Sequence, residues 1–171
     1  MKVGNGETVG NHQKGKLYTI GHSNHEIKDF LKILREKKIE QLVDVRSTPY
    51  SKYSPYFNQN EIKKSLESEG IQYHYLGKKI GGRPSDEDYY KDDKVIYSLV
   101  EMDEKYKEGI IMLENLIDDK RTVLMCSEED PHKCHRHMLI TPTLLKKGYR
   151  VSHIRGTGET EEVQDRQTTL F

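Results

Sequence analysis

Residues 16–38, KLYTIGHSNHEIKDFLKILREKK, contain the change of pattern that decides the fold. Their first part is a short apolar run that stops at Gly21, which is typical of a strand. Apolar residues then recur at the spacing of one helical face, at Ile27, Phe30, Leu31 and Leu34. Ser23 and Glu26 have the spacing of a capping box, which predicts the start of a helix. The stretch therefore predicts a strand followed directly by a helix.

The same alternation continues along the chain. Further strands are predicted in the runs EQLVDVRS, IQYHYLG, RTVLMCSEE and YRVSHI, at residues 40–47, 71–77, 121–129 and 149–154. Helices are predicted at residues 58–70, within 86–118, and at 135–148 with a kink at Pro142. Strands that alternate with helices favour a parallel sheet covered on both faces. We therefore expect an α/β fold, a three-layer α/β/α domain with a mostly parallel sheet of about five strands.

Composition and pattern divide the 171 residues into three segments. Residues 1–15 hold no periodic apolar pattern and are expected to form a flexible leader. Residues 16–155 form a single α/β domain, and the polar residues 156–171 are expected to be a disordered tail. With 28 basic and 28 acidic residues, the formal charge is zero. That balance argues against a protein whose whole surface is positively charged, but it allows a local basic patch.

Cysteine content and hydropathy indicate the compartment. Two cysteines form no disulfide framework, and the lysine-containing N-terminus has no signal-like apolar segment. No apolar run approaches the roughly 20 residues of a membrane span. We therefore expect a cytoplasmic protein that has no membrane segment.

Polar residues follow nearly every predicted strand. In an open parallel sheet, ligands bind beyond the carboxyl ends of the strands, so these residues are expected to form one site. They are His22 and Ser23, then Asp44, Arg46 and Ser47, then the loop from Gly77 to Arg83, then Cys126, Ser127, Glu128 and Glu129.

Two of these groups have both a structural and a functional interpretation. Gly21 either lets the backbone approach an anion at a helix start or forms a tight turn with Ser23 as a cap. Asp44 and Arg46 lie on the same side of a strand. They either form an internal ion pair or place an acid or base beside a guanidinium that binds phosphate or carboxylate.

Two loops suggest contacts with nucleic acid. LGKKIGGRP, residues 76–84, is glycine-rich, although its spacing matches neither a P-loop nor a dinucleotide fingerprint. Its basic residues can hold a phosphodiester, and they are Lys78, Lys79 and Arg83. TPYSKYSPYFNQ, residues 48–59, carries rings that can stack on bases or pack over the core. These rings belong to Tyr50, Tyr53, Tyr56 and Phe57.

The segment MCSEEDPHKCHRH has the densest chemistry in the chain. Cys126 ends a strand, and Cys134 lies at a helix start. The helix dipole and the neighbouring Arg136 favour the thiolate, so we expect Cys134 to be the more reactive thiol. These cysteines and nearby histidines such as His135 are soft metal ligands. A Cys-x7-Cys spacing is not that of common zinc sites, however, so we expect little or no metal and no cofactor.

The motifs YTIGHS, DVRSTPYS, GGRP and LMCSEEDPHKCHR, followed by GYRVSHI, resemble the domain-of-unknown-function family numbered 488. The resemblance covers residues 17–154 in the family's order, and the Cys-His-Arg segment is its most specific element. It implies a three-layer α/β domain but no settled reaction. It also implies a shared site at His22, Ser23, Asp44, Arg46, Cys126, Glu128, Cys134, His135 and Arg136. The family's LGG appears here as LGKKIGG, so this loop departs from the family pattern.

The sequence QTTLF at residues 167–171 resembles the pentapeptide by which DNA repair and replication proteins dock on the bacterial sliding clamp. In that mode a disordered linker presents Leu170 and Phe171 to a hydrophobic pocket, and Gln167 forms hydrogen bonds at its rim. The alternative is a segment whose Leu-Phe pair folds back on the core. The eukaryotic and archaeal motif usually continues to a second aromatic residue, so a bacterial type of clamp is favoured.

Three functional classes are compatible with these features. The first is an enzyme that performs hydrolytic or glycosidic chemistry on damaged or modified DNA and is tethered to the clamp. Its expected residues are Glu128 or Asp44 as acid/base, Arg46 and Arg136 as phosphate anchors, and His22 as an orienting donor. Chemistry on a base in duplex DNA requires flipping, for which the tyrosine-rich loop is a candidate wedge.

The second class is a non-catalytic adaptor that binds nucleic acid or a protein partner and uses the tail to localise. The third is a thiol-dependent enzyme that acts on a small molecule at Cys126. It is suggested because DVR with a later strand-end cysteine is similar to rhodaneses.

Overall fold

The structure is a computed structural model that describes residues 14–23 and 25–165. The clamp-like pentapeptide and nearly all of the expected leader lie outside the described residues. The helices are α1 (Ile27–Glu36), α2 (Gln59–Ser68), α3 (Gly77–Ile80), α4 (Tyr97–Val100), α5 (Glu104–Asp119) and α6 (Thr141–Lys146). The strands are β1 (Lys16–Gly21), β2 (Gln41–Asp44), β3 (Gln72–Tyr75), β4 (Tyr90–Lys91), β5 (Lys94–Val95), β6 (Thr122–Cys126), β7 (Arg150–Ile154) and β8 (Thr160–Glu162). In the described part of the chain, no helix is long and apolar enough to cross a membrane.

One mixed sheet of six strands forms the centre of the domain, in the order β3-β2-β6-β1-β7-β8. The five strands predicted from the sequence are β1, β2, β3, β6 and β7, and they pair in parallel. The sixth strand, β8, runs antiparallel to β7 at one edge. Strands β4 and β5 form a separate hairpin. The predicted parallel α/β sheet is therefore confirmed.

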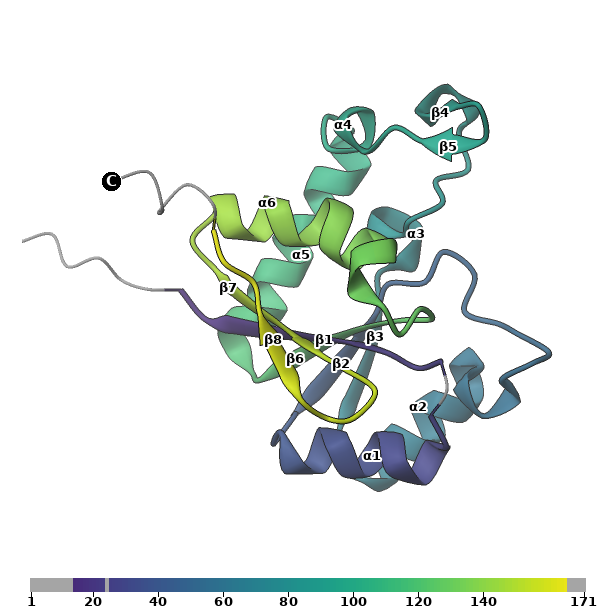
Figure 1. Cartoon of the computed structure of the whole chain (residues 1–171), viewed down its shortest axis with the longest axis vertical. Helices are drawn as coiled ribbons and strands as arrows, with labels where there is room; N and C mark the ends of the chain where they lie inside the picture. Colours follow the sequence, from purple (N-terminus) through teal and green to yellow (C-terminus); the bar gives the residue numbers. More distant parts are fainter. Residues whose placement is uncertain (1–13, 24, 166–171) are drawn as a thin grey trace, which may run out of the picture.

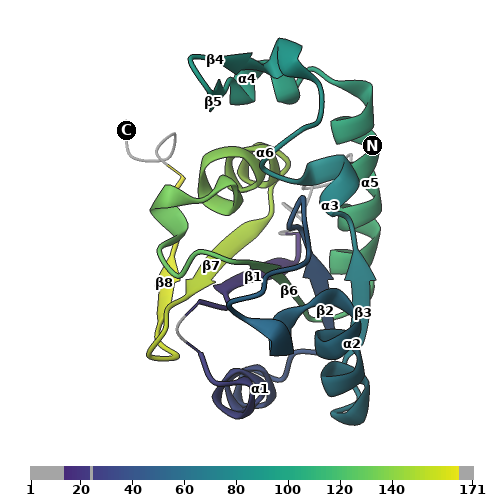
Figure 2. The same ribbon diagram turned by 90° about the vertical axis from the view of Figure 1, so that its right-hand side faces the viewer.

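Helices cover both faces of this sheet, so the three-layer arrangement is confirmed. Figures 1 and 2 show α1 and α2 on one face and α3, α5 and α6 on the other. Successive side chains of each strand point to opposite faces of the sheet, so they pack into two separate cores. Tyr18 and Ile20 of β1 pack toward α1 and α2 with Phe30 and Leu34. Leu17 lies in the other core, which also contains Leu113, Leu139 and Leu144 from the helical segments opposite.

The expected capping box at the start of α1 is wrong. The helix begins at Ile27 with Glu26 as its N-cap, and no side chain caps it. The hydroxyl of Ser23 instead donates a hydrogen bond to the backbone carbonyl of Ser127. Ser23 belongs to the junction between β1 and the loop after β6, which sequence spacing within one helix does not reveal.

Two further expectations need correction at the C-terminal end of the domain. Residues 160–162 form β8, so the expected disordered tail does not begin at residue 156. The predicted helix over residues 135–148 is divided into a π-helical turn (Arg136–Ile140) and α6. Pro142 lies in the first turn of α6, where its missing N–H removes one backbone hydrogen bond to the preceding turn.

The order of the strands creates a crevice between β2 and β6. These strands are neighbours, but the chain leaves β2 through α2 on one face and leaves β6 through α6 on the other. The two connections diverge, and such a switch point in an open α/β sheet is where ligands bind. The topology therefore locates the candidate site at the ends of β2 and β6.

Candidate functional site

A cavity of about 410 Å³ lies at this switch point. Its lining comes from the segments after β2, after α3 and after β6, together with α4. The lining residues are Arg46, Ser47, Thr48, Gly82, Arg83, Tyr97, Cys126, Ser127, Glu128, Lys133, Cys134 and His135. The structure thus brings together at one cavity the predicted residues Arg46, Ser47, Arg83, Cys126, Glu128, Cys134 and His135.

The floor of the cavity contains two sulfur atoms and one imidazole nitrogen. The Nδ1 atom of His135 lies 3.8 Å from Cys126 Sγ and 3.7 Å from Cys134 Sγ. All three ligand atoms lie within 4.8 Å of one another, and all three residues are buried. Cys126 ends β6, and Cys134 and His135 immediately precede the π-helical turn. The two elements converge because the chain turns back across the sheet edge after β6.

The ring of His135 is fixed on both sides. Its Nε2 atom lies 3.1 Å from the backbone carbonyl of Val45, which can only accept a hydrogen bond. Nε2 therefore carries the proton, and Nδ1 presents a lone pair to the two sulfur atoms when the ring is neutral. Gly82 packs against this ring so closely that an added Cβ would lie 2.7 Å from Nδ1. The glycine of the predicted basic loop thus supports the imidazole.

Arg136 is fully buried beside the cysteines. Its Nε donates a hydrogen bond to Cys134 Sγ at 3.3 Å, and Nη2 donates to the backbone carbonyl of Glu128 at 2.5 Å. Its Nη1 donates to the hydroxyl of Thr19 at 3.3 Å. Within residues 14–23 and 25–165 it forms no ion pair with a carboxylate. The predicted role of Arg136 as a phosphate anchor is therefore wrong, because the side chain faces sulfur and backbone rather than the cavity.

The two cysteines have opposite acidities. The hydrogen bond from the Cys126 thiol, helped by His135 and Arg136, holds the pKa of Cys134 well below its usual range. The same hydrogen bond and burial raise the pKa of Cys126. The surroundings therefore favour negative charge on Cys134, beside the Arg136 guanidinium, over negative charge on Cys126.

Asp44 and Arg46 form a buried bidentate ion pair. Arg46 Nε lies 2.9 Å from Asp44 Oδ1, and Nη2 lies 2.8 Å from Oδ2. The hydroxyl of Tyr73 also donates to Oδ2, at 2.7 Å. Asp44 is fully buried and does not line the cavity, so its predicted role as an acid/base is wrong. Of the two interpretations of DVRS, the internal ion pair is the one that this geometry favours.

His22 orients the same guanidinium. Its Nε2 accepts from Arg46 Nη1 at 3.3 Å, and its ring stacks on Phe57 with centroids 4.7 Å apart. Burial, followed by the nearby Arg46 charge, lowers the pKa of His22 from 6.5 to about 4, so the ring is neutral at pH 7. The backbone of Gly21 packs against the carbonyl of Glu128, where an added Cβ would lie only 1.7 Å away. This glycine therefore serves strand packing rather than the approach of an anion.

Glu128 differs from Asp44 because its side chain is exposed. It lines the cavity, and its Oε2 lies 3.5 Å from Cys126 Sγ. Arg83 and Lys133 line the same cavity, are exposed, and form no ion pair with a carboxylate in the part of the chain that the structure describes. The cavity wall thus combines one accessible carboxylate with two exposed cationic side chains.

A second cavity of about 550 Å³ adjoins the first and shares Ser47 and Arg83 with it. Lys78, Lys79 and Lys105 lie along it, although Asp86 and Asp103 also line it and Lys79 pairs with Glu108. Basic side chains thus continue beyond the first cavity, interspersed with acidic ones. Of the tyrosine-rich loop, Phe57 packs into the core, and three rings remain exposed. They are Tyr50 at 68%, Tyr53 at 83% and Tyr56 at 67% exposure. Figure 1 shows this loop, between β2 and α2, reaching out on the side where β2 and β6 end.

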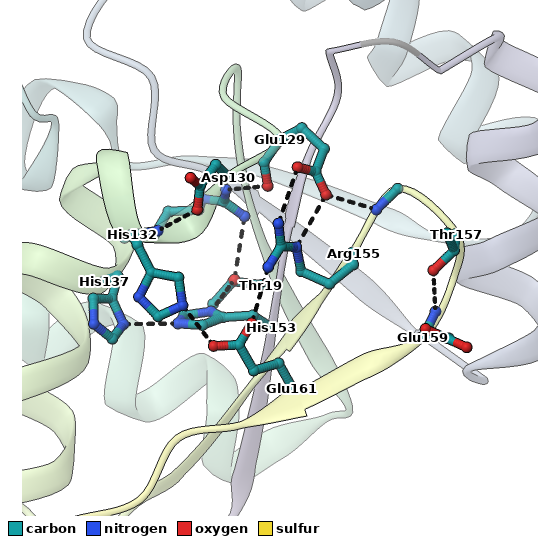
Figure 3. Close-up of polar contacts among 12 residues, drawn as sticks. Thr19, Glu129, Asp130, His132, His137, His153, Arg155, Thr157, Glu159 and Glu161 are labelled. Carbon is teal, nitrogen blue, oxygen red and sulfur yellow. Dashed lines mark hydrogen bonds and ion pairs between the residues drawn. The ribbon is translucent and has the colours of Figure 1, made fainter.

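A second polar cluster, which the sequence analysis did not identify, lies at the ends of β7 and β8. Figure 3 shows His132, His137 and His153 with Glu161 and Arg155. His137 Nδ1 lies 3.0 Å from His153 Nε2, and His132 Nε2 lies 2.5 Å from a Glu161 oxygen. Its residues come from elements that are adjacent only in the folded sheet.

The strand-end residue Glu129 belongs to this second cluster rather than to the cavity. Its carboxylate accepts from Arg155 Nε at 3.0 Å and from the backbone N–H of Gly156 at 2.9 Å, as Figure 3 shows. These hydrogen bonds lower the pKa of Glu129.

A comparison with protein families finds one whose description is Domain of unknown function DUF488, matched over residues 26–141. The matched segment contains every residue that lines the first cavity and leaves out His22, Ser23 and β7. Comparisons with curated proteins and with solved structures find no match.

Proposed function

This chain belongs to the DUF488 family, and we propose that it is an enzyme that acts on nucleic acid by hydrolytic or glycosidic chemistry. The observation that carries the proposal is the composition of the first cavity. Two exposed basic side chains, Arg83 and Lys133, line it together with Arg46, whose charge is balanced by Asp44. This concentration of positive charge beside an accessible carboxylate suits an anionic substrate and a proton transfer.

The surroundings of the cavity support a nucleic acid over a small anion. Further basic side chains, Lys78 and Lys105, line the second cavity, so they can contact additional phosphates of a backbone. Tyr50, Tyr53 and Tyr56 are exposed aromatic rings in the adjacent loop, and bases stack on such rings. In this proposal Glu128 is the acid/base, Arg83 and Lys133 bind phosphate, and Arg46 is held in place by Asp44 and His22.

The clamp-like pentapeptide supports a role in DNA repair. A protein that docks on the sliding clamp is delivered to newly copied or damaged DNA. We therefore propose the clamp as a partner and DNA as the first substrate to test.

Binding of a fluorescent single-stranded oligonucleotide tests the proposed substrate class. The double variant Arg83→Ala/Lys133→Ala is expected to bind about tenfold more weakly or worse. For this variant, the slope of log K against log salt concentration is expected to be less negative by about 1.4, because two phosphate contacts are removed. Lys32→Ala, on α1 and exposed on the other side of the sheet, is the matched control and is expected to bind like the wild type.

Turnover is tested by mass spectrometry of oligonucleotides that carry modified bases. Glu128→Gln is expected to abolish product formation while keeping wild-type affinity. Binding without turnover on any modified or unmodified substrate would favour the non-catalytic adaptor. Absence of binding in both the wild type and the Arg83/Lys133 variant would overturn the proposal.

A further inference from the structure

We propose that Cys126, Cys134 and His135 bind one zinc ion at the floor of the first cavity. This reverses the expectation from sequence spacing that the chain holds little or no metal. The inference deepens the proposed function, since a zinc ion can activate water for a hydrolytic step. The identity of the substrate rests on the proposed function, whereas the metal site itself does not.

The distances between the ligand atoms match a tetrahedral ion. With Zn–S bonds of about 2.3 Å and a Zn–N bond of about 2.0–2.1 Å, tetrahedral angles place sulfur and nitrogen about 3.6 Å apart. The corresponding distances from His135 Nδ1 are 3.8 Å to Cys126 and 3.7 Å to Cys134. Both sulfur–nitrogen distances therefore match those that a zinc ion would impose, and the two sulfur atoms lie within 4.8 Å of each other.

The groups behind the ligands have the arrangement found around metal sites. A metal-binding histidine usually donates its second N–H to a carbonyl or carboxylate, which fixes the ring and its tautomer. His135 makes that contact with the Val45 carbonyl at 3.1 Å, so Nδ1 is the free donor atom. The guanidinium of Arg136 donates to Cys134 Sγ at 3.3 Å, and such a hydrogen bond supports a coordinated thiolate.

The ligand set also indicates which metal binds and what the site does. Two thiolates and one imidazole form a soft set that suits zinc, and three protein ligands leave a fourth position for water or substrate. Glu128 Oε2 lies 3.5 Å from Cys126 Sγ, but Glu128 is not part of the group whose ligand atoms all lie within 4.8 Å. Its carboxylate lies beside Cys126 on the cavity wall, where it would be the proton acceptor for a water in the fourth position.

The charges around the site would suit this chemistry. A zinc ion and two thiolates would together be neutral, and the buried Arg136 would leave one positive charge at the site. A site of that charge would lower the pKa of a bound water. Glu128, which is exposed on the cavity wall, would be the proton acceptor.

Metal content of the full-length protein, purified without added metal or chelator, is the first test. We expect about one equivalent of zinc by mass spectrometry of the elements. Replacement by Co²⁺ should give the thiolate charge-transfer absorption and the visible bands of a tetrahedral ion. Cys126→Ser and Cys134→Ser are expected to retain less than about one tenth of an equivalent. His132→Asn, in the same segment but outside the ligand group, is the matched control and should keep its zinc.

Two measurements keep the test decisive if a cysteine variant fails to fold. Glu128→Gln is expected to keep the zinc, because the carboxylate is not a ligand, and the cobalt spectrum needs only the wild type. Less than about one tenth of an equivalent of zinc, together with no cobalt spectrum after loading, would overturn the proposal. So would a Cys126–Cys134 disulfide, seen as an intact mass lower by two hydrogen atoms.

The oligonucleotide experiments separate this proposal from the proposed function. Zinc without oligonucleotide binding would refute the substrate class and leave the metal site standing. Oligonucleotide binding by a protein that takes up no metal would refute the metal site alone.

Discussion

Two buried arginine side chains lie beside the cavity, and they differ in what balances their charge. Arg46 is neutralised by both carboxylate oxygens of Asp44. Among the described residues, Arg136 contacts a cysteine sulfur, a hydroxyl and backbone carbonyls but no carboxylate. A buried cation with a carboxylate partner can belong to the scaffold, because the pair is self-contained. A buried cation beside a sulfur atom favours the thiolate form of that sulfur, so Arg136 stabilises negative charge on Cys134.

Asp44→Asn is expected to lower the free energy of unfolding by about 3–5 kcal/mol, because it leaves the buried Arg46 without its counter-charge. Glu128→Gln is expected to change it by less than about 0.5 kcal/mol, because that side chain is exposed. Urea titrations of the two variants and the wild type measure both values. A loss of more than about 2 kcal/mol for Glu128→Gln would assign this carboxylate to the scaffold instead.

At the scale of elements, a chain of polar contacts joins β1, β7 and the π-helical turn. Thr19 of β1 contacts His153 Nδ1 at 2.6 Å, and His153 of β7 contacts His137 of the turn at 3.0 Å (Figure 3). The Thr19 hydroxyl also accepts a hydrogen bond from Arg136 Nη1. His153 is fully buried beside Arg136, so burial and that cation disfavour a protonated, charged ring.

Stability is therefore expected to fall in acid. Burial and the neighbouring Arg136, with smaller effects from His137 and His132, lower the pKa of His153 from 6.5 to about 3, and Glu161 opposes this shift only in part. The unfolded chain then binds the proton more tightly than the folded chain. Stability is fully present above pH 6.5 and is lost as the pH falls toward 3.

The slope for this single group is about 1.4 kcal/mol per pH unit. His153→Asn is expected to reduce the slope of the free energy of unfolding against pH by about that amount. This expectation holds whatever the substitution does to absolute stability. Urea titrations across this pH window, for the variant and the wild type, provide the comparison. Equal slopes would show that His153 does not carry the effect.

At the scale of the molecule, the divergence of the chain at β2 and β6 assembles a site from segments far apart in the sequence. The same divergence leaves the Tyr50–Tyr56 loop and the second cavity on the side of the sheet where the strands end. A substrate with several phosphates and bases can therefore contact both while one group enters the first cavity. In the proposed function, the pentapeptide at residues 167–171 tethers this arrangement to the sliding clamp.

The protein is expected to bind a bacterial-type sliding clamp through residues 167–171. Deletion of these residues should abolish binding in surface plasmon resonance and leave the thermal midpoint nearly unchanged, because a tether contributes little to a folded core. The double substitution Thr168→Ala/Thr169→Ala is the matched control, since it keeps Gln167, Leu170 and Phe171. A large loss of thermal stability in the deletion would show that the segment packs on the core and would contradict the tether.

Much of the fold follows from local sequence. Each of the five parallel strands and the helices α1, α2 and α5 has its own apolar pattern, because burial on one or two faces imposes a period on neighbouring residues. The alternation of strands and helices then restricts the topology to a parallel sheet with two covered faces. The position of the cavity also follows, because strand ends of a parallel sheet share one edge.

The roles of individual residues did not follow. Asp44 and Glu128 are both acidic residues near a strand end, yet one is sealed in an ion pair and the other faces the cavity. The strand β8 has the polar sequence TEE, and only its pairing with β7 makes it a strand. Cys126 and Cys134 lack a metal-binding spacing, and they meet His135 only because β6 and the π-helical turn converge. Local periodicity determines elements, whereas burial, charge pairing and ligand geometry depend on neighbours that only the tertiary fold brings together.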